Sequence, residues 1–206
     1  VGLDDEAVAG EDQVRARLDE GTGREGVPGP IEDEAAEVER SDGTKVVVDK
    51  DQQPRPETSM ESLAGLKAVF KENGRVTAGN ASGLNDGAGA VLLMSEKKAE
   101  TLGLQPKMRW VASAVAAVDP TIMGTAPVPA TLKALDKAGL TMSDLGIIEM
   151  NEAFAVQALY CLDRLGLKAD DPRVNMWGGS LAFGHPLAAS GPRLVSFLMN
   201  LFRENA

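Results

Sequence analysis

The 206-residue sequence predicts an α/β fold in which helices cover a mixed sheet in layers. Two observations lead to this class. From residue 57 onward, short apolar runs typical of strands alternate with segments whose apolar residues follow helical spacing, and glycine-rich loops join them. Ligands in such folds bind where loops leave the ends of strands. The functional residues are therefore sought in the glycine-rich loops.

The first 56 residues differ in composition from the rest. They hold sixteen Asp and Glu against seven Lys and Arg and no aromatic residue, so they carry −9 of the net charge of −10. Residues 21–30 have the composition of a loop, and Asp42-Gly43 can form a hairpin turn between the apolar stretches of Val38–Asp49. We expect residues 1–56 to be an acidic, partly mobile loop-region segment and residues 57–206 to be one α/β domain.

Composition also argues against several classes of partner and binding site. A net charge of −10 opposes binding to nucleic acid or to an anionic membrane. No apolar run approaches the roughly 18 residues of a membrane helix, and no basic-then-apolar signal segment opens the chain, so we expect a cytoplasmic or organelle-matrix protein without a membrane span. One cysteine and one histidine can form neither an internal disulfide nor a structural zinc site, and we expect no metal.

The first helix is predicted to begin at Thr58, which forms a capping box with Glu61, and to end at Asn73-Gly74. Its apolar residues fall at helical spacing: Met60, Leu63, Leu66 and Phe70. A short strand over 75–78 then leads into the glycine-rich loop 79–90. The glycines there permit close approach of a ligand or, equally, of another backbone. Their spacing matches neither a dinucleotide fingerprint nor a phosphate loop, which argues against nucleotide hydrolysis.

The middle of the chain continues the alternation. We expect a strand at Val91–Met94, a helix that Ser95 opens and that runs to Thr101, and a β-rich stretch over Met108–Val118. Residues 123–129 contain two prolines and break the chain before a helix at Ala130–Ala138.

The next segment combines a buried strand at Gly146–Met150 with a helix that starts after Asn151 and runs to about Leu165. Asparagine alone at this place is typical of a helix cap. One helix face carries Phe154, Ala158, Cys161 and Leu165. Cys161 therefore belongs to the core and is not a nucleophile that partners the histidine.

The last candidate stretch, Val174–Arg193, contains the sole histidine. Gly184 lets the backbone approach a ligand, and Pro186 stiffens the turn, so His185 is held in place between them. A neutral imidazole, with an unperturbed pKa of about 6.5, is the usual general base near neutral pH. Without further context, a capped or core histidine is the alternative.

Three of these stretches resemble motifs of the thiolases, which cleave or form 3-ketoacyl-CoA by acyl transfer to CoA. They are the loop 79–90, the sequence Asn-Glu-Ala-Phe-Ala from Asn151, and the glycine-rich stretch around His185, and they occur in the family's order within residues 57–203. The resemblance implies a thiolase-like fold in which His185 is the catalytic base. It also implies that Asn151 holds a water that completes an oxyanion hole, an arrangement worth about 10² to 10³ in rate.

The same resemblance implies a set of residues that bind CoA and substrate: Ala81, Ser82, Met123, Phe154 and Gly184. In the family, the position of Ser82 contacts the pantetheine arm, the position of Met123 lines it, and the position of Phe154 lines the acyl pocket. Core packing is the alternative for Met123 and for Phe154.

Some family features are missing or altered. Thiolases use two cysteines, and neither matches a position here, so the chain resembles roughly the C-terminal half of a member and is expected to be incomplete at both ends and inactive alone. Trp177 and Phe183 replace residues that are common in the family, and the Trp-Gly-Gly-Ser version favours the β-oxidation branch.

The resulting hypothesis is an acyl-CoA acyltransferase that cleaves 3-ketoacyl-CoA with CoA, or runs the reverse condensation, and that forms a homo-oligomer, a dimer or a tetramer. CoA and acyl-CoA would be its substrates and partners, and no permanently bound cofactor is expected. A non-catalytic CoA-binding or assembly subunit derived from a thiolase is the alternative. An acidic interaction module built on residues 1–56 is a third.

Overall fold

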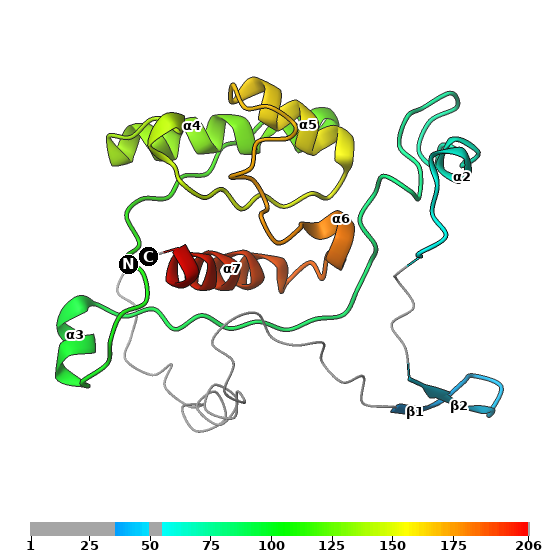
Figure 1. Cartoon of the computed structure of the whole chain (residues 1–206), viewed down its shortest axis with the longest axis horizontal. Coiled ribbons are helices and arrows are strands. Elements are labelled where there is room, and N and C mark those ends of the chain that lie inside the picture. Colours follow the sequence, from blue (N-terminus) through cyan, green and yellow to red (C-terminus); the bar gives the residue numbers. More distant parts are fainter. Residues whose placement is uncertain (1–35, 50–54, 206) are drawn as a thin grey trace. The chain divides into compact units, whose positions relative to one another are not determined.

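The computed structural model describes residues 36–49 and 55–205, and the chain divides into two units, Val1–Gln52 and Gln53–Ala206 (Figure 1). The described part of the first unit is a hairpin in which β1 (Ala36–Glu39) pairs antiparallel with β2 (Lys45–Val48). At its turn, Gly43 has φ +80°, a backbone conformation that favours glycine. The predicted hairpin is confirmed. Residues 1–35 of the acidic segment lie outside the described residues.

The turn of the hairpin is closed by Asp42. Its carboxylate accepts hydrogen bonds from the Thr44 hydroxyl at 2.6 Å and from the Thr44 amide at 2.9 Å. These bonds lower the pKa of Asp42 from its ordinary value.

The second unit begins with α2 (Met60–Ala64), which is shorter than predicted. Ser59 caps it and forms the capping box with Ser62, whereas the Thr58 hydroxyl donates to a carbonyl outside the helix, so the predicted cap was wrong. The helix ends at Gly65 instead of Asn73-Gly74. The chain then folds back, and the side chains of Leu63 and Leu66 lie against the backbone of Gly79. Two of the apolar residues whose spacing suggested one long helix therefore pack against the returning chain.

The predicted strands of the second unit do not form a paired sheet. Within residues 55–205, pairing consists of three isolated bridges: Ala68↔Thr77, Ala81↔Phe154 and Ile148↔Val174. The segments 91–94 and 108–118 contain no assigned strand. A strand needs a neighbour that supplies ladder hydrogen bonds, and the described part of this unit brings none to them. Val115, in the second segment, is 85% exposed.

The helices of the middle region follow the prediction more closely. Ser95 caps α3 (Glu96–Thr101) through a hydrogen bond to its first turn, as expected. A 3-10 helix, η1 (Pro120–Thr125), precedes α4 (Pro127–Ala138), which starts three residues earlier than expected because proline is tolerated in a first turn. Gly139, with φ +67°, ends α4, and a second 3-10 helix, η2 (Met142–Asp144), follows.

Three more helices complete the unit: α5 (Ala155–Arg164), α6 (Ser180–Phe183) and α7 (Ser190–Asn205). Helix α5 packs against α4 and η1 (Figure 1). Its Cys161 is fully buried, and its Sγ lies 3.5 Å from the carbonyl oxygen of Gly124. The prediction that Cys161 belongs to the core is confirmed.

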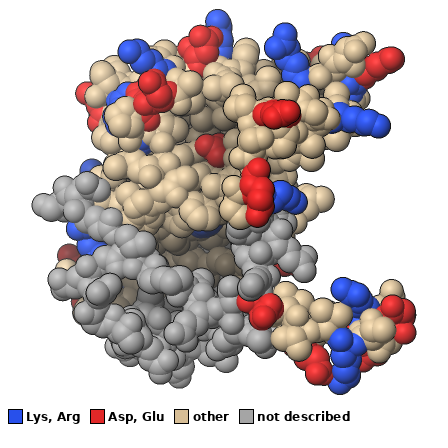
Figure 2. Space-filling model, turned by 45° about the vertical axis from the view of Figure 1, so that its right-hand side comes forward, with Lys and Arg blue, Asp and Glu red and all other residues tan. Residues whose placement is uncertain are grey.

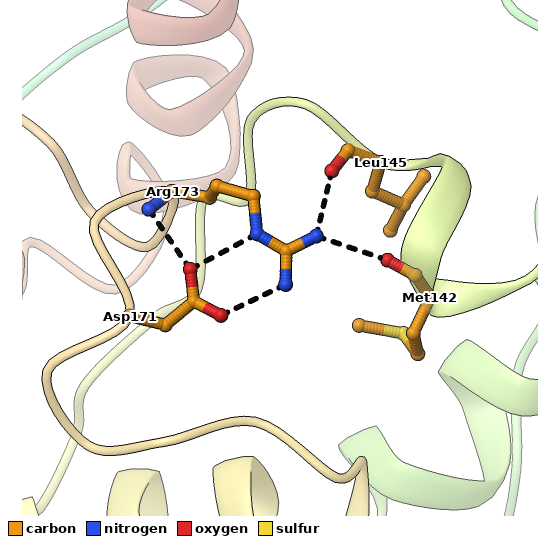
Figure 3. A network of polar contacts seen from close by, with 4 residues as sticks. All are labelled: Met142, Leu145, Asp171 and Arg173. Atoms are coloured by element: carbon orange, nitrogen blue, oxygen red, sulfur yellow. Dashed lines mark hydrogen bonds and ion pairs between the residues drawn. The ribbon is translucent and has the colours of Figure 1, made fainter.

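Arg173 connects the loop after α5 to η2 (Figure 3). Its guanidinium forms two hydrogen bonds to the carboxylate of Asp171, at 2.8 and 3.0 Å. It also donates to the carbonyl oxygens of Met142, at 3.2 Å, and Leu145, at 2.9 Å. The hydrogen bonds from Arg173 lower the pKa of Asp171 to about 2. The carbonyl of Arg173 accepts the amide of Ile148 at 2.8 Å, so this cluster also fixes the start of the segment that carries Asn151.

Helix α7, at 16 residues, is the longest in the described ranges. None of the helices in residues 36–49 and 55–205 has the length and apolar content that a membrane crossing requires.

Candidate active site

The loop that follows Gly79 joins the two predicted catalytic segments. Both the amide and the hydroxyl of Ser82 donate to the carbonyl of Ala153, each at 3.0 Å. The amide of Ala155 donates to Asn80 at 2.9 Å, and the amide of His185 donates to Gly83 at 3.0 Å. The strip 80–83 therefore holds the histidine segment and the segment after Asn151 on the same stretch of backbone.

The side chains of Asn151 and His185 meet, although 34 residues separate them in the sequence. The Asn151 amide nitrogen Nδ2 lies 3.3 Å from His185 Nε2. Phe154, not Asn151, is the N-cap residue of α5, so the helix-cap interpretation of Asn151 is wrong. The amide of Asn151 is instead directed toward the imidazole.

His185 is held at its other ring nitrogen as well. Nδ1 lies 2.6 Å from the hydroxyl of Ser190, which in turn donates to the carbonyl of Pro186 at 3.1 Å. Gly184 precedes the histidine with φ +83°, and a side chain at this position would overlap the amide group of Asn85. Glycine is required there, and the ring is oriented by contacts on both nitrogens.

Asn175 supports the segment before Asn151 from the histidine loop. It is buried and has φ +46°. Its side chain exchanges two hydrogen bonds with the backbone of Met150, at 2.8 and 3.0 Å, and donates to the carboxylate of Glu152 at 2.7 Å. That carboxylate lies directly against the backbone of Gly179. The sequence contained one signal for this role, an asparagine three residues before a Gly-Gly pair, and its function was missed.

A second unanticipated group is Glu149, two residues before Asn151. Both of its carboxylate oxygens are buried, and neither has a hydrogen-bond partner among the described residues. Burial raises the pKa of Glu149 to about 7; the positive charge of Arg193 opposes this shift and the negative charge of Glu152 adds to it. No feature of the sequence indicates this role, since a glutamate at the end of an apolar run does not reveal its burial.

A cavity of about 370 Å³ opens beside Phe154. Its lining comes from η1 and from α5 with the residue before it: Pro120, Thr121, Ile122, Met123, Gly124, Thr125, Phe154, Val156, Gln157 and Tyr160. Met123 is 70% exposed, so core filling does not explain it. Phe154 packs edge-on against Phe70, with ring centroids 5.7 Å apart, and its backbone bridges to Ala81. The structure thus places the predicted binding residues Met123 and Phe154 on one cavity, and Ala81, Ser82 and Gly184 on the loops around the histidine.

In the part of the chain that the structure describes, no three His, Cys, Asp or Glu side chains gather in a way that could hold a metal ion.

Taken together, the fold and the site define an α/β chain with a histidine–asparagine pair between glycine-rich loops. The family model for the thiolase N-terminal domain matches residues 26–97, and that for the thiolase C-terminal domain matches residues 104–206. The loop with Ser82 falls in the first match, and Asn151 and His185 fall in the second. The chain belongs to the thiolase family.

Individual relatives agree with this assignment. The chain is 54% identical over 166 residues to a 3-ketoacyl-CoA thiolase of Marinomonas sp., an alignment that covers 80% of this chain and 42% of that protein. Among solved structures, the acetyl-CoA acetyltransferase of Bacillus anthracis matches 83% of this chain and 43% of its own, with TM-score 0.72 and 42% identity. Human mitochondrial 3-ketoacyl-CoA thiolase in complex with CoA matches 77% of this chain and 40% of its own, with TM-score 0.71 and 44% identity.

These matches confirm the predicted thiolase-like α/β fold class. The chain spans about two fifths of the length of the curated relatives it matches.

Proposed function

We propose that this chain supplies the histidine and asparagine of a thiolase active site, which cleaves 3-ketoacyl-CoA with CoA or runs the reverse Claisen condensation. The observation that carries the proposal is the contact of 3.3 Å between Asn151 Nδ2 and His185 Nε2, which joins the Asn-Glu-Ala-Phe-Ala segment to the glycine-rich histidine loop of a thiolase-family chain. Relatives named 3-ketoacyl-CoA thiolase support the choice of substrate.

In this proposal the two side chains have different tasks. His185 Nε2 accepts the proton of a thiol, because a free thiol with a pKa near 8.5 is only a few per cent ionised at neutral pH. The Asn151 amide donates to a water that stabilises the negative charge forming on the thioester oxygen. The residue types fit the two tasks, since an imidazole changes protonation near neutrality and an amide does not.

CoA and acyl-CoA are the proposed substrates, and no permanently bound cofactor is invoked. Backbone at Ala81, Ser82 and Gly184 would approach the ligand beside the imidazole. Met123 and Phe154 would line its apolar part in the cavity of about 370 Å³. The solved human relative whose complex contains CoA supports this ligand class.

The isolated 206-residue chain is expected not to turn over 3-ketoacyl-CoA. An acyl-enzyme needs a thiolate that substrate can reach, and the single thiol of this chain, Cys161, is fully buried. Purified chain should leave the thioester intact and show no acyl adduct by intact mass. Turnover with an adduct on Cys161 would contradict both statements.

The catalytic roles are tested in a complete thiolase polypeptide that carries these residues. His185→Ala should lower kcat by about 10² or more while CoA affinity stays nearly unchanged. Asn151→Asp places a negative charge at the developing oxyanion, so turnover should collapse. Leu187→Ala, an exposed position two residues after the histidine, is the control and should retain activity. CoA binding without turnover in the unmutated polypeptide would favour the non-catalytic alternative.

We also propose that the protein forms a homo-oligomer and works in the cytoplasm or an organelle matrix. Figure 2 shows charged side chains, some of them in adjacent pairs, on a face that is mostly uncharged. Large apolar side chains are exposed on the unpaired extended segments: Leu84, Leu92, Leu93, Trp110, Val111 and Val115. Such exposure is typical of surfaces that associate. Sedimentation velocity over a concentration series tests this proposal, and a monomer at all concentrations would contradict it.

A further inference from the structure

A chain of hydrogen bonds runs from Arg193 on α7 to the catalytic pair. The guanidinium Nη2 donates to the hydroxyl of Ser180 at 2.7 Å, and this hydroxyl donates to Asn151 Oδ1 at 2.6 Å. Ser180 is fully buried. The roles proposed above for His185 and Asn151 leave both of these residues unexplained.

The direction of each bond follows from the chemistry of the groups. A guanidinium can only donate, so the Ser180 oxygen accepts from Arg193. The single hydroxyl hydrogen is then available for Asn151, and a distance of 2.6 Å is in the range of O–H···O bonds. The carbonyl oxygen of the Asn151 amide is thereby fixed toward Ser180, and its nitrogen is fixed toward the imidazole.

The orientation of the amide determines which nitrogen of the neutral ring carries hydrogen. Because Asn151 Nδ2 is a donor, His185 Nε2 must face it with a lone pair. The ring hydrogen is then on Nδ1, where the Ser190 hydroxyl accepts it at 2.6 Å and donates onward to Pro186. The contacts on both sides of the ring require the same tautomer.

We propose that Arg193 and Ser180 are positioning residues that hold neutral His185 in the Nδ1–H tautomer, so that Nε2 on the side of Asn151 is the basic nitrogen. The catalytic importance of this arrangement rests on the proposed function, but the tautomer itself does not. Arg193 fixes the neighbouring backbone too, because its Nη1 donates to the Gly184 carbonyl at 2.9 Å.

The test uses the fact that His185 is the sole histidine. The chain is purified without a histidine tag after labelling with ¹⁵N-histidine, and the two ring nitrogen shifts are measured at about pH 8, where an ordinary imidazole is neutral. Magic-angle spinning of sedimented chain reads the same shifts if the chain associates. We expect the shift of a bare nitrogen at Nε2 and that of a protonated nitrogen at Nδ1. A predominantly protonated Nε2 would overturn the proposal.

Variants test the role of the distant residues. Ser180→Ala frees the Asn151 amide to rotate. The ratio of the two tautomers should then shift about fivefold toward Nε2–H, which is the change that the free energy of one ordinary hydrogen bond produces. Arg193→Met should shift it in the same direction, and Arg193→Lys, which keeps a donor, should restore most of it. Ser196→Ala is the matched control, because its hydroxyl bonds only to the α7 carbonyl of Pro192 in the contacts described.

The outcomes separate this proposal from the proposed function. An unchanged tautomer ratio in both Ser180→Ala and Arg193→Met, with the tryptophan near-UV signal of a folded chain, overturns the positioning role. A shifted ratio supports it, whether or not a complete polypeptide turns over 3-ketoacyl-CoA. If Ser180→Ala loses the folded signal, Arg193→Met and Arg193→Lys are compared instead. Equal tautomer ratios in these two variants overturn the positioning role.

Discussion

Replacing Glu149 with glutamine should stabilise the chain above neutral pH. The two carboxylate oxygens are buried without hydrogen-bond partners among the described residues, and burial raises the pKa of Glu149 from 4.5 to about 7. A shift of this size corresponds to at most about 3 kcal/mol. The side chain keeps partial contact with solvent, and the charge of Arg193 already compensates part of the cost, so we expect about 1 to 2 kcal/mol at about pH 8.

The sign of the pH dependence follows from proton binding. Between pH 4.5 and about 7 the folded chain holds a proton on Glu149 that the unfolded chain has lost. The stabilising effect of that proton is complete below the unfolded pKa and disappears as the pH rises through the folded pKa. Wild-type stability should therefore fall across this window and level off above it, and Glu149→Gln should remove this component of the slope.

The assay is urea unfolding at about pH 5 and about pH 8, the two sides of the titration. Tryptophan fluorescence reports the transition, since Trp177 packs edge-on against Phe197 at 5.6 Å. Glu72→Gln, at an exposed glutamate, is the control for the change of charge. If wild type and Glu149→Gln differ equally at both pH values, burial of a charged carboxylate is not the cause and the reasoning fails.

Three further outcomes are expected. Gly179→Ala should destabilise the chain by about 1 to 3 kcal/mol in urea unfolding, because a methyl group would overlap the Glu152 carboxylate, whereas Gly146→Ala, with open space, should not. Asp171→Asn should reduce the loss of stability between about pH 4 and about pH 2 in acid titrations. The folded chain lowers the pKa of Asp171, and the stability that this gives is lost as the pH falls through the folded pKa. An unchanged loss of stability over this pH range would contradict the prediction. Cys161 should react with a thiol reagent only as fast as the chain unfolds, and immediate labelling of folded chain would refute its burial.

Predictions from local signals were correct where the interactions involve only a few neighbouring residues. Asp42-Gly43 formed its hairpin turn, Ser95 capped its helix, and the apolar face around Cys161 became buried. Each depends on neighbours within one or two turns of chain. Such interactions are encoded in residue order and need no knowledge of the rest of the fold.

Long-range pairing was not predictable in the same way. The stretch Met108–Val118 has strand-like composition, but ladder hydrogen bonds come from a neighbouring segment, and none is provided within residues 55–205. The early end of α2 has a related cause, because Leu63 and Leu66 pack against Gly79 after the chain returns. In both cases tertiary context decided between conformations that the local sequence allowed.

The same distinction between local signals and long-range contacts applies to the candidate active site. The glycine-rich stretch revealed where His185 lies and the Asn-Glu-Ala-Phe-Ala stretch revealed where Asn151 lies, whereas the contacts of Arg193 with Gly184 and Ser180 form only in the folded chain. The charge of Arg193 also opposes the rise in the pKa of Glu149, so its removal changes two groups at once. Ser180→Ala interrupts the hydrogen-bond chain and leaves the positive charge in place. In a Glu149→Gln background, Arg193→Met can no longer act through the charge of the carboxylate. Its remaining effect on the tautomer ratio of His185 should then match that of Ser180→Ala. A larger remaining shift of the tautomer ratio would show that Arg193 also acts on His185 through the Gly184 carbonyl, its other contact beside the ring.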